Sequence, residues 1–580
     1  MESSTIRLSP TLRAGTCCEG GVLPALRWPS SVRCFRPSSA CCSAEAITCG
    51  LSFLPPAVRA RVRRAGADFA AFAFEISFLF FIIGRCRGLR TTLPAILIRK
   101  LKLRASAGSP PGEGAQVVMI IADGVRPDVL ARSIARGDLP ALAALRDEGA
   151  LSTVTSAFPS VTGPAYAPFI MGRYPGSVGL PGLRWFDRSH RIPRLSGHSR
   201  SYVGPEMRFV DRDIDAASPT IFELAKPSVG ALSVIGRGLR RRERIGQSAV
   251  FIARAAVTHF RGNVRGWLAI DRHVGEEVAR RLRTRRMKYA FVALTGVDKT
   301  SHSAGQDSPI VTDALRIVDD TVAEIRSDAE RDGRWEKMHL WVGSDHGHSS
   351  VRDHEDLTAI LADWGYSTLS HPWAFNTRAD IAVMVSGNAM AHLYLDLDQQ
   401  TRPWWPALRG KWSDLVDRLL SRESGDLLIL PTSPSSCDIT APGRGVARLS
   451  WSESSYCYTP SSGDPLGLGE QQSLDDSESY DATVDSDYPD SLVQIAHLIG
   501  SARSGDIILS AARDWDYRAK YEPIPHVSSH GALHREHMIV PLLLNRAPVR
   551  SPRRTVDVMP SALAALGITP PKTLDGVSVS

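Results

Sequence analysis

Cysteine is scarce in most of this 580-residue sequence, and the few cysteines that it has are unevenly placed. Only Cys437 and Cys457 lie beyond residue 87, and they can form one disulfide outside the cytoplasm or stay as two free thiols. The earlier cysteines lack the spacing of a zinc finger, which excludes that class of site. They are Cys17, Cys18, Cys34, Cys41, Cys42, Cys49 and Cys86.

The main body also lacks an excess of positive charge. Residues 1–104 hold 16 Lys and Arg against 5 Asp and Glu, a net charge of +11. The rest of the chain holds 53 Lys and Arg against 56 Asp and Glu, a net charge of −3, and the two together give the total of +8. The basic character therefore belongs to the N-terminal segment, and no binding of a nucleic-acid polymer is expected. With 43% apolar residues the chain is ordinary globular material, long enough for one large core or for two to four domains.

Long hydrophobic runs are absent too, with one exception. Residues 69–84, FAAFAFEISFLFFIIG, are apolar apart from Glu75 and are flanked by arginines. Sixteen residues are few for a membrane span, and a carboxylate in lipid is costly. A signal-anchor, an interfacial helix on anionic headgroups and a simple buried segment all fit. We therefore treat residues 66–104 as a membrane-associated or signal-anchor segment.

The flanks of that segment show no periodic pattern. Residues 1–65 mix Ser, Pro, Arg and Cys, which predicts disorder or a true start codon further downstream. Residues 105–114 contain SAGSPPGEG, a linker composition. The folded body is expected at 115–580.

Short apolar strands alternate with helices along this body. That alternation predicts an α/β fold with a doubly wound, mostly parallel sheet flanked by helices. The expected strands are 117–122, 150–155, 231–235, 289–294, 339–342, 506–510 and 539–544, with a hairpin at 380–386 and 390–396. The expected helices are 127–136, 139–148, 272–287, 308–327, 557–566 and one beginning at Pro219. Insertions near 180–215 and 440–490 are expected to form caps. The Ser/Asp/Gly-rich and acidic stretch 453–490 is expected to be a long insertion on the surface.

Acidic side chains and histidines follow several of the strands. Asp123 stands after the first strand, Asp298 after 289–294, and Asp345 with His346 after 339–342. The carboxyl ends of strands in an open α/β sheet form the crevice where ligands bind. His302 and the later His530 complete a mixture of hard acids and imidazoles that suits Zn²⁺, and less specifically Mn²⁺ or Mg²⁺.

A hydroxyl lies between turn-forming residues in Pro159-Ser160-Val161-Thr162-Gly163-Pro164. A hydroxyl beside a metal becomes a nucleophile because the metal lowers its pKa. Thr162, Ser160 and the earlier Thr155 are the candidate hydroxyls, and an ordinary turn residue is the simpler interpretation.

Taken together, these motifs resemble the alkaline phosphatase superfamily, and in particular its type I phosphodiesterase/nucleotide pyrophosphatase branch. The motifs are IADGVRPD, PSVTGPAY…MGRYPG, GVDKTSH, GSDHG and SSHGALHREHMIVPLLL, with a closing RTVDVMPSALAALGI. As an ordered set over residues 117–570 they are specific, although each alone is weak.

The resemblance implies an alkaline-phosphatase-like fold and a two-metal site. It assigns Asp298, His302 and His530 to one divalent ion, most simply Zn²⁺. It assigns Asp123, Asp345 and His346 to the other. It makes Thr162, rather than Thr155 or Ser160, the hydroxyl that bridges to this metal and becomes phosphorylated. The sequence departs from the branch at Gly163 and Ala165, where those enzymes have Phe and a phosphate-contacting Asn. No Cys-x-Pro-x-Arg run occurs, which speaks against a sulfatase with an oxidised cysteine.

Several other residues allow two interpretations. A lone Asp after a strand is most often a helix N-cap. Arg126 and Arg173 can meet phosphate, but pairing with a carboxylate is the plainer role. The aromatic residues Trp185, Phe186 and Tyr202 can line a leaving-group pocket or pack in the core. Surface or second-shell roles are expected for the remaining histidines of these motifs, namely His348, His354, His526, His534 and His537.

The expected function is that of a metal-dependent hydrolase that cleaves phosphodiester or related phosphoester bonds through a phospho-threonine. The uncharged surroundings of Thr162 favour diesters, including lipid-like or nucleotide-like molecules, over monoesters. Alternatives are a phosphomonoesterase, a transferase that passes the phospho group to a lipid or sugar, and a binding protein with a dead site. An extracytoplasmic location, tethered or released, is favoured, with possible membrane association through residues 66–104. The oligomeric state is left open.

Overall fold

A computed structural model describes residues 114–579, apart from 190–197, 372–377, 518–523 and 525. All of these residues belong to one of the two units into which the chain divides, Pro94–Ser580. The predictions for 1–65, 66–104 and 105–113 concern residues outside this part. Within the described residues, no helix combines the length and the apolar character needed to cross a bilayer.

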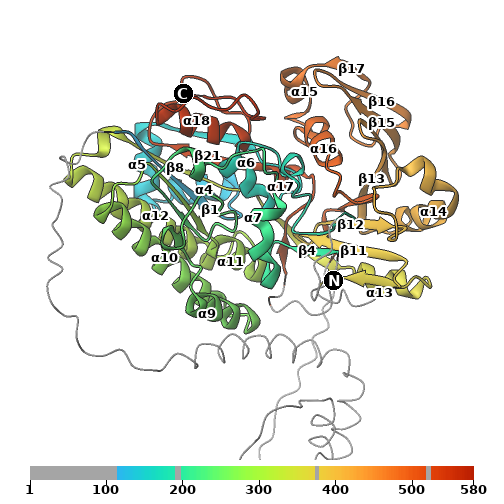
Figure 1. Cartoon of the computed structure of the whole chain (residues 1–580), viewed down its shortest axis with the longest axis horizontal. Coiled ribbons are helices and arrows are strands. Elements are labelled where there is room, and N and C mark those ends of the chain that lie inside the picture. Colours follow the sequence, from blue (N-terminus) through green and yellow to red (C-terminus); the bar gives the residue numbers. More distant parts are fainter. Residues whose placement is uncertain (1–113, 190–197, 372–377, 518–523, 525, 580) are drawn as a thin grey trace, which may run out of the picture. The chain divides into compact units, whose positions relative to one another are not determined.

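A seven-stranded sheet forms the centre of the described unit (Figure 1). Its strand order is β2-β21-β8-β1-β7-β5-β6; the five strands from β8 to β6 are parallel, and β21 and β2 join antiparallel at one edge. The strands are β1 (Gln116–Ala122), β2 (Ala150–Thr155), β5 (Ser228–Ala231), β6 (Arg244–Ile245), β7 (Tyr289–Leu294), β8 (Met338–Gly343) and β21 (Ile539–Leu544). The predicted doubly wound, mostly parallel sheet is thus confirmed.

Both faces of this sheet are covered, which explains why its central strands β1, β7 and β8 consist almost entirely of apolar residues. On β1, Val117, Met119 and Ile121 belong to one buried cluster, whereas Val118 and Ile120 belong to the other. The first cluster includes residues of α6 (Ala167–Met171), α8 (Ile221–Leu224) and α18 (Val558–Ala565). The second includes residues of α4 (Pro127–Ala135), α5 (Pro140–Glu148), α10 (Val264–Thr284) and α12 (Pro309–Arg331).

A second, nine-stranded sheet contains most of the chain between residues 368 and 511, and sequence reasoning recognised only its hairpin and one strand. Its order is β10-β11-β12-β18-β13-β14-β15-β16-β17, and all its pairs are antiparallel except β10 with β11. The strands are β10 (Thr368–Ser370), β11 (Ile381–Ser386), β12 (Met390–Leu395), β13 (Gly425–Ser433), β14 (Ser436–Ala441), β15 (Gly445–Trp451), β16 (Tyr456–Gly463), β17 (Gln471–Leu474) and β18 (Ile507–Ala511).

Helices flank this second sheet as well. They are α13 (Leu357–Asp363), α14 (Trp405–Leu420), α15 (Asp476–Thr483) and α16 (Ser491–Ile499). Residues of α13 and α14 share a buried cluster with β11 and β12, whereas residues of α16 belong to a cluster with β14 and β15. The stretch 453–490 therefore supplies β16, β17 and α15 to an ordered layer, where the sequence indicated a surface excursion.

Two small sheets complete the fold. One joins β9 (Ser349–His354) to β19 (Asp514–Asp516) and β20 (Ser528–Ser529), and the other pairs β3 (Arg184–Phe186) with β4 (Ser199–Ser201). The pairing of β20 with β9 brings the segment before His530 back to the strand that follows the Asp345 loop. The short α7 (Val210–Asp213) and α17 (Arg535–Met538) lie in connecting segments.

Element positions differ from the predictions in two places. The strand predicted at 231–235 is β5 at Ser228–Ala231, and the basic helix predicted at 272–287 is α10 at Val264–Thr284. Cys437 on β14 and Cys457 on β16 are both free thiols, because β15 lies between their strands.

Candidate active site

Three neighbouring parallel strands, β8, β1 and β7, each end beside a carboxylate. Asp123 follows β1 directly, Asp345 lies just past β8, and Asp298 is in the first turn of α11 (Gly296–Ala304), which follows β7. All three side chains are completely buried. Because parallel strands end at the same edge, the fold gathers three charges in one place, as the sequence predicted.

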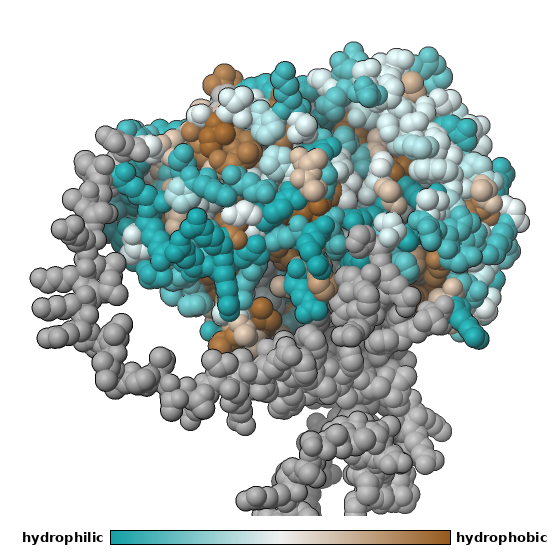
Figure 2. All heavy atoms as spheres, viewed as in Figure 1, coloured by the Kyte–Doolittle hydropathy of each residue, from teal (hydrophilic) through white to brown (hydrophobic). Residues whose placement is uncertain are grey.

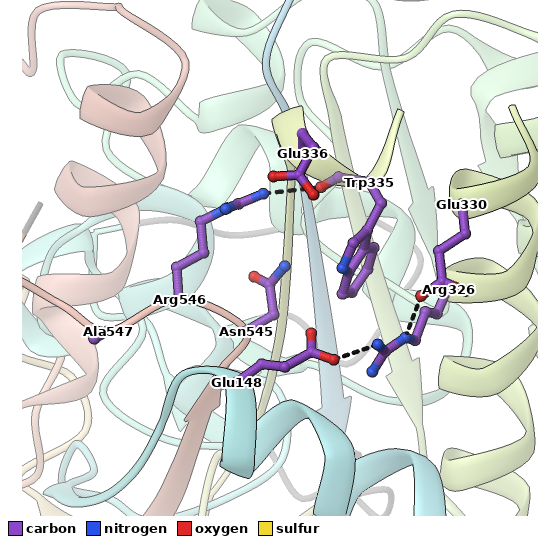
Figure 3. Close-up of a pocket in the computed structure, with 8 residues that line it drawn as sticks. All are labelled: Glu148, Arg326, Glu330, Trp335, Glu336, Asn545, Arg546 and Ala547. Atoms are coloured by element: carbon purple, nitrogen blue, oxygen red, sulfur yellow. Dashed lines mark hydrogen bonds and ion pairs between the residues drawn. The ribbon is translucent and has the colours of Figure 1, made fainter. Parts of the chain in front are cut away.

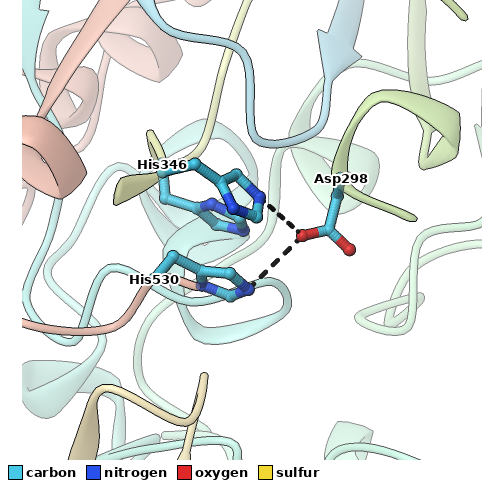
Figure 4. A group of neighbouring side chains, drawn as sticks. Asp298, His346 and His530 are labelled. Atoms are coloured by element: carbon cyan, nitrogen blue, oxygen red, sulfur yellow. Dashed lines mark hydrogen bonds and ion pairs between the residues drawn. The ribbon is translucent and has the colours of Figure 1, made fainter. Parts of the chain in front are cut away.

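Oxygen Oδ1 of Asp298 is shared by three imidazoles. Its distances to Nε2 are 3.1 Å for His302, 3.0 Å for His348 and 3.4 Å for His530. Figure 4 shows Asp298 facing the rings of His346 and His530, which stack with centroids 3.6 Å apart. The other oxygen, Oδ2, accepts from the Lys299 ammonium at 2.7 Å.

A second group surrounds Asp123. Nε2 of His346 lies 3.2 Å from Asp123 Oδ1 and 3.5 Å from Asp345 Oδ2. The Tyr166 hydroxyl donates to Asp123 Oδ2 at 2.7 Å, which fixes the rotation of that carboxylate. Oδ2 of Asp345 is buried and has no hydrogen-bond partner among the described residues.

Thr162 reaches this second group from the loop that follows β2. Its Oγ1 lies 3.1 Å from Asp123 Oδ1, to which it donates, and 3.0 Å from His346 Nε2. Thr162 is partly exposed, whereas the acids and histidines beside it are buried. The hydroxyl is therefore placed where a group arriving from solvent can reach the cluster.

The residue after Thr162 explains one departure from the family pattern. Gly163 has φ +101°, and a Cβ there would lie 2.4 Å from the ring carbon Cδ1 of Tyr202. Tyr202, 1% exposed, thus fills the space that a larger side chain at 163 would need. Trp185 and Phe186 are also buried in the core, so the plainer interpretation of these three aromatics holds.

Each imidazole of the cluster is held through its far nitrogen. Nδ1 lies 2.8 Å from the Ser528 carbonyl for His302, 3.1 Å from the Gly347 carbonyl for His346, and 3.0 Å from the Ser160 carbonyl for His530. A carbonyl can only accept, so Nδ1 carries a proton in these three rings and Nε2 is the nitrogen that faces the cluster. Metal-binding histidines in proteins are oriented in this way.

Electrostatics favour neutral imidazoles at Asp298. Burial lowers the pKa values of His302 and His348, and it lowers the pKa of His530 to about 3. Burial alone would raise the pKa of Asp298, but Lys299 and His302 hold it well below its usual range. An ionised carboxylate beside neutral imidazoles is the donor set that a divalent transition metal prefers.

In the second group, the buried carboxylates of Asp123 and Asp345 shift the pKa values of their neighbours. Burial and the neighbouring Asp123 raise the pKa of Asp345 well above its usual range. Burial alone would lower the pKa of His346, but Asp345 and Asp123 outweigh it and raise the value to about 9. Two buried carboxylates that attract a cation at one point make a site suited to a metal ion.

The residues present therefore fit two divalent ions. Asp298, His302 and His530 would hold one, with His348 at the same oxygen, and Asp123, Asp345, His346 and Thr162 would hold the other. Independently of the motif, two buried groups have donor atoms within 4.8 Å of one another. They are Asp298, His346, His348 and His530, and Asp123, Asp345 and His346.

Three further residues touch the cluster: His348, for which a surface or supporting role was expected, and Lys299 and Tyr166, which the sequence did not single out. His348 is fully buried, and its Nδ1 lies 2.9 Å from the Ser528 hydroxyl. Its signal was the second histidine in Gly343-Ser344-Asp345-His346-Gly347-His348. Tyr166 gave no signal, because an aromatic residue in an apolar helix reads as core.

The other ambiguous histidines lie around the cluster. His526 stacks on His302 with centroids 4.1 Å apart, and His354 is half-exposed beside Asp516. His534 and His537 are buried, with hydrogen bonds to the Ala511 carbonyl and the Ser349 hydroxyl.

The rival hydroxyls and the arginines are engaged elsewhere. The Ser160 hydroxyl donates to the Ala532 carbonyl at 2.9 Å, and the Thr155 hydroxyl to the Arg553 carbonyl at 3.4 Å. Arg126 pairs with Asp128 at 2.8 Å, and Arg173 with Asp575 at 3.3 Å. Pairing with carboxylates was the expected role of both arginines.

A cavity of about 520 Å³ lies away from this cluster (Figure 3). It is bordered by Trp335, just before β8, and by Asn545, just after the antiparallel β21, so it lies at the opposite end of β8 from Asp345. Arg326 stacks over Trp335 and pairs with Glu330 at 2.7 Å and with Glu148. Three glutamates and two arginines line the cavity, and its lining contains none of the histidines and aspartates that form the buried cluster.

Fold and site together define a hydrolase-type centre with candidate two-metal sites at the carboxyl edge of a parallel sheet. The sequence profile of the type I phosphodiesterase/nucleotide pyrophosphatase family matches residues 117–415, which is more than half of the chain. The chain belongs to this family. His530 and most of the second sheet lie beyond the matched residues. No curated protein matches the sequence.

Solved structures of related folds are distant. Phosphonoacetate hydrolase from Sinorhizobium meliloti 1021, in complex with phosphonoacetate, is 17% identical, covers 78% of this chain and 96% of its own, and has a TM-score of 0.49. An inactive variant of murine ectonucleotide pyrophosphatase/phosphodiesterase 5, in complex with AMP, is 13% identical. The match covers 81% of this chain and 98% of the murine chain, with a TM-score of 0.47. The human ectonucleotide pyrophosphatase/phosphodiesterase 5 is 14% identical, and the match covers 79% of this chain and 96% of the human chain, with a TM-score of 0.46.

Proposed function

We propose that this protein is a metal-dependent hydrolase that cleaves phosphodiesters through a covalent intermediate on Thr162. One observation carries the proposal: Thr162 Oγ1 is a partly exposed hydroxyl within 3.1 Å of Asp123 and 3.0 Å of His346, which belong to a buried donor cluster. Ser160 and Thr155, by contrast, are hydrogen-bonded to backbone carbonyls.

The reaction that this arrangement supports has two displacements. Thr162 Oγ1 forms a bond to phosphorus and releases its proton to solvent, while the bond from phosphorus to one alkoxide breaks and that alkoxide takes a proton from solvent. Water then attacks the phospho-threonine. Its hydroxyl stays on phosphorus, the bond from phosphorus to Thr162 Oγ1 breaks, and the second proton of the water passes to Thr162 Oγ1. Two bound divalent ions, zinc being our preference, would supply Lewis acidity toward the nucleophile and the phosphoryl oxygens.

Diesters are the favoured substrates because the surroundings of Thr162 carry little positive charge. Gly163, Pro164 and Ala165 are uncharged and buried, and Arg126 and Arg173 are paired with carboxylates. A diester brings one negative charge and a second organic group, so it needs less cationic support than a monoester dianion. Small-molecule and lipid phosphoesters of this class are the proposed substrates.

Phosphomonoester hydrolysis is the second candidate, and Lys299 is the observation that favours it. Its ammonium is 2.7 Å from Asp298 Oδ2, and its side chain is 23% exposed. A cation at this place can offset the second charge of a monoester.

One set of assays separates these proposals. We expect the metal-loaded protein to hydrolyse bis-p-nitrophenyl phosphate with a higher kcat/KM than p-nitrophenyl phosphate. Thr162→Ala should lower kcat by roughly a thousandfold or more, while Ser160→Ala and Thr155→Ala stay within about tenfold. A clear preference for the monoester, lost in Lys299→Gln, would make the protein a phosphatase. Full activity of Thr162→Ala would refute the intermediate.

We further propose an extracytoplasmic location, tethered or released. The net charge of +11 in residues 1–104 and the apolar run at 69–84 support it. A reporter enzyme that is active only outside the cytoplasm, fused after residue 110, should be active. An inactive, stably produced fusion would contradict the location without touching the proposed chemistry.

A further inference from the structure

Helix α9 (Ala249–Phe260) is apolar and yet lies on the surface. Its sequence is AVFIARAAVTHF, and Thr258 is its one buried residue. Eight large apolar side chains are exposed among the described residues, and four of them belong to this helix: Val250 (81%), Ile252 (41%), Val257 (41%) and Phe260 (50%). Apolar residues appear at the lower edge of the molecule in Figure 2, where α9 lies in Figure 1.

The outward face of α9 is largely apolar, with Arg254 as its charged residue. Phe251 and Ala255 pack against the core cluster of the central sheet. Val250, Ala253, Val257 and Phe260 follow at intervals of three and four residues, which places them on one stripe turned away from that contact. A surface helix normally carries polar residues there, and one that is apolar all round is covered by protein or lipid.

Arginines surround this helix in the sequence. Residues 237–266 contain eight arginines and one acid, Glu243, a net of +7, although residues 105–580 together have a net of −3. Six of the eight are exposed: Arg240, Arg241, Arg242, Arg254, Arg261 and Arg265. Among the described residues only Arg240 of these six forms an ion pair, with Glu243 at 4.0 Å.

We propose that α9 and its arginines dock the protein on the surface of an anionic lipid bilayer. The apolar stripe would enter the boundary between headgroups and acyl chains, while the guanidinium groups meet lipid phosphates. Amphipathic helices with basic flanks bind membranes in this way, with an apolar face some 5–10 Å deep. The inference concerns a surface that the proposed reaction does not use.

Charge complementarity selects a bilayer as the occupant. A second copy of this face would place arginines against arginines, which is repulsive. The apolar run at 69–84 of the same chain is itself flanked by Arg61, Arg63, Arg64, Arg85, Arg87 and Arg90, so it too would bring like charge to this face. Anionic lipid supplies both the phosphates and the apolar phase at once.

The test uses the full chain and vesicles of phosphatidylcholine with 30% phosphatidylserine, or of phosphatidylcholine alone. Binding is measured by co-sedimentation, and the exchange of amide hydrogens in residues 249–260 is followed by mass spectrometry. We expect stronger binding to the anionic vesicles, weakened by salt, and slower exchange in α9 on binding. The exchange reports on α9 itself, so binding through another part of the chain cannot imitate it.

Two pairs of substitutions of equal chemistry provide the comparison. Val250→Glu with Phe260→Glu should lower the partition coefficient at least about tenfold. Val549→Glu with Val577→Glu changes side chains that are 90% and 57% exposed elsewhere, and should bind like the wild type. Arg254→Gln and Arg261→Gln should each lower binding to anionic vesicles about fivefold.

Three results would overturn the proposal. One is unchanged exchange in α9 when anionic vesicles bind. Another is equal partitioning of the wild type and the Val250→Glu, Phe260→Glu variant. The third is strong protection of α9 in the absence of vesicles. In that case, a dimer that the variant abolishes would identify a second copy as the occupant of this face, and a monomer would identify another segment of this chain. Hydrolytic activity of the soluble variants, measured in parallel, is expected to be unchanged and reports on the proposed function separately.

Discussion

The Nε2 atom of His348 lies 3.0 Å from Oδ1 of Asp298, the same oxygen that His302 and His530 approach. Its other nitrogen is fixed by the Ser528 hydroxyl at 2.9 Å. We therefore expect His348→Ala to weaken metal binding at the Asp298 site by about 10- to 100-fold, as loss of a ligand or of its oriented neighbour does. The affinity for metal is measured as the metal content that remains after dialysis against graded chelator concentrations. His354→Ala, at a half-exposed position beside Asp516, is the control, and equal retention of metal by both variants would contradict the prediction.

Gly163 and Tyr202 share one space, so enlarging the glycine should disturb Thr162. At φ +101° and 2.4 Å from the ring, a Cβ at 163 costs about 1–3 kcal/mol and displaces the loop. Gly163→Ala should lower both the free energy of unfolding and kcat, and adding Tyr202→Ala should restore part of kcat. Gly467→Ala is the matched control, because Gly467 has φ +69° and nothing within 4 Å of its Cβ position. If Tyr202→Ala gives no relief, the contact is not the cause.

Removal of the metal ions should destabilise the protein as well as inactivate it. Three buried carboxylates lie together, and the described cations near them are Lys299 and a protonated His346. Ligands that bind only the folded state add about 2.7 kcal/mol at a hundred times their Kd. Calorimetry before and after chelation should show a fall in Tm, reversed by zinc. The Asp298→Asn variant should respond less to the chelator. An unchanged Tm with unchanged activity would refute a two-metal centre.

His392 should make the protein sensitive to acid. It lies on β12 and is fully buried, with Nε2 2.8 Å from the Pro181 carbonyl, and burial lowers its pKa to about 4. An unfolded histidine has a pKa near 6.5, so between about pH 6.5 and pH 4 the unfolded chain binds more protons. The free energy of unfolding must fall as pH falls through that window, by about 2 kcal/mol from pH 7 to pH 5. Denaturation by urea at both pH values should show a smaller fall in His392→Gln. Equal falls would assign the acid sensitivity to other groups.

The central sheet and the strand-end acids could be predicted because both follow from local pattern. Strands buried on two faces are apolar throughout, and their order in the chain alternates with helices. Asp123, Asp298 and Asp345 then meet at one edge without further information. Thr162 was predicted as the nucleophile from its turn-forming neighbours and the resemblance to the family, and its hydroxyl does lie beside Asp123.

The second sheet could not be predicted in the same way. Its outer strands β15 to β17 are exposed on one side and contain Ser, Gly and Gln, a composition that also describes loops. What orders them is pairing with neighbours, from β14 onward. The contacts of His348 could not be predicted for a similar reason: it precedes β9, whose pairing with Ser528 and Ser529 joins distant segments.

The hydrogen bond from His530 to the Ser160 carbonyl joins residues 370 positions apart. His530 depends on β20 for its place, and β20 on β9, so the third imidazole at Asp298 arrives only when that late segment has been synthesised and has paired. The strands that place Asp123, Asp298 and Asp345 therefore precede, in the order of synthesis, the segment that completes the donor cluster. The ligand set at Asp298 is thus closed by one of the last parts of the chain to be made.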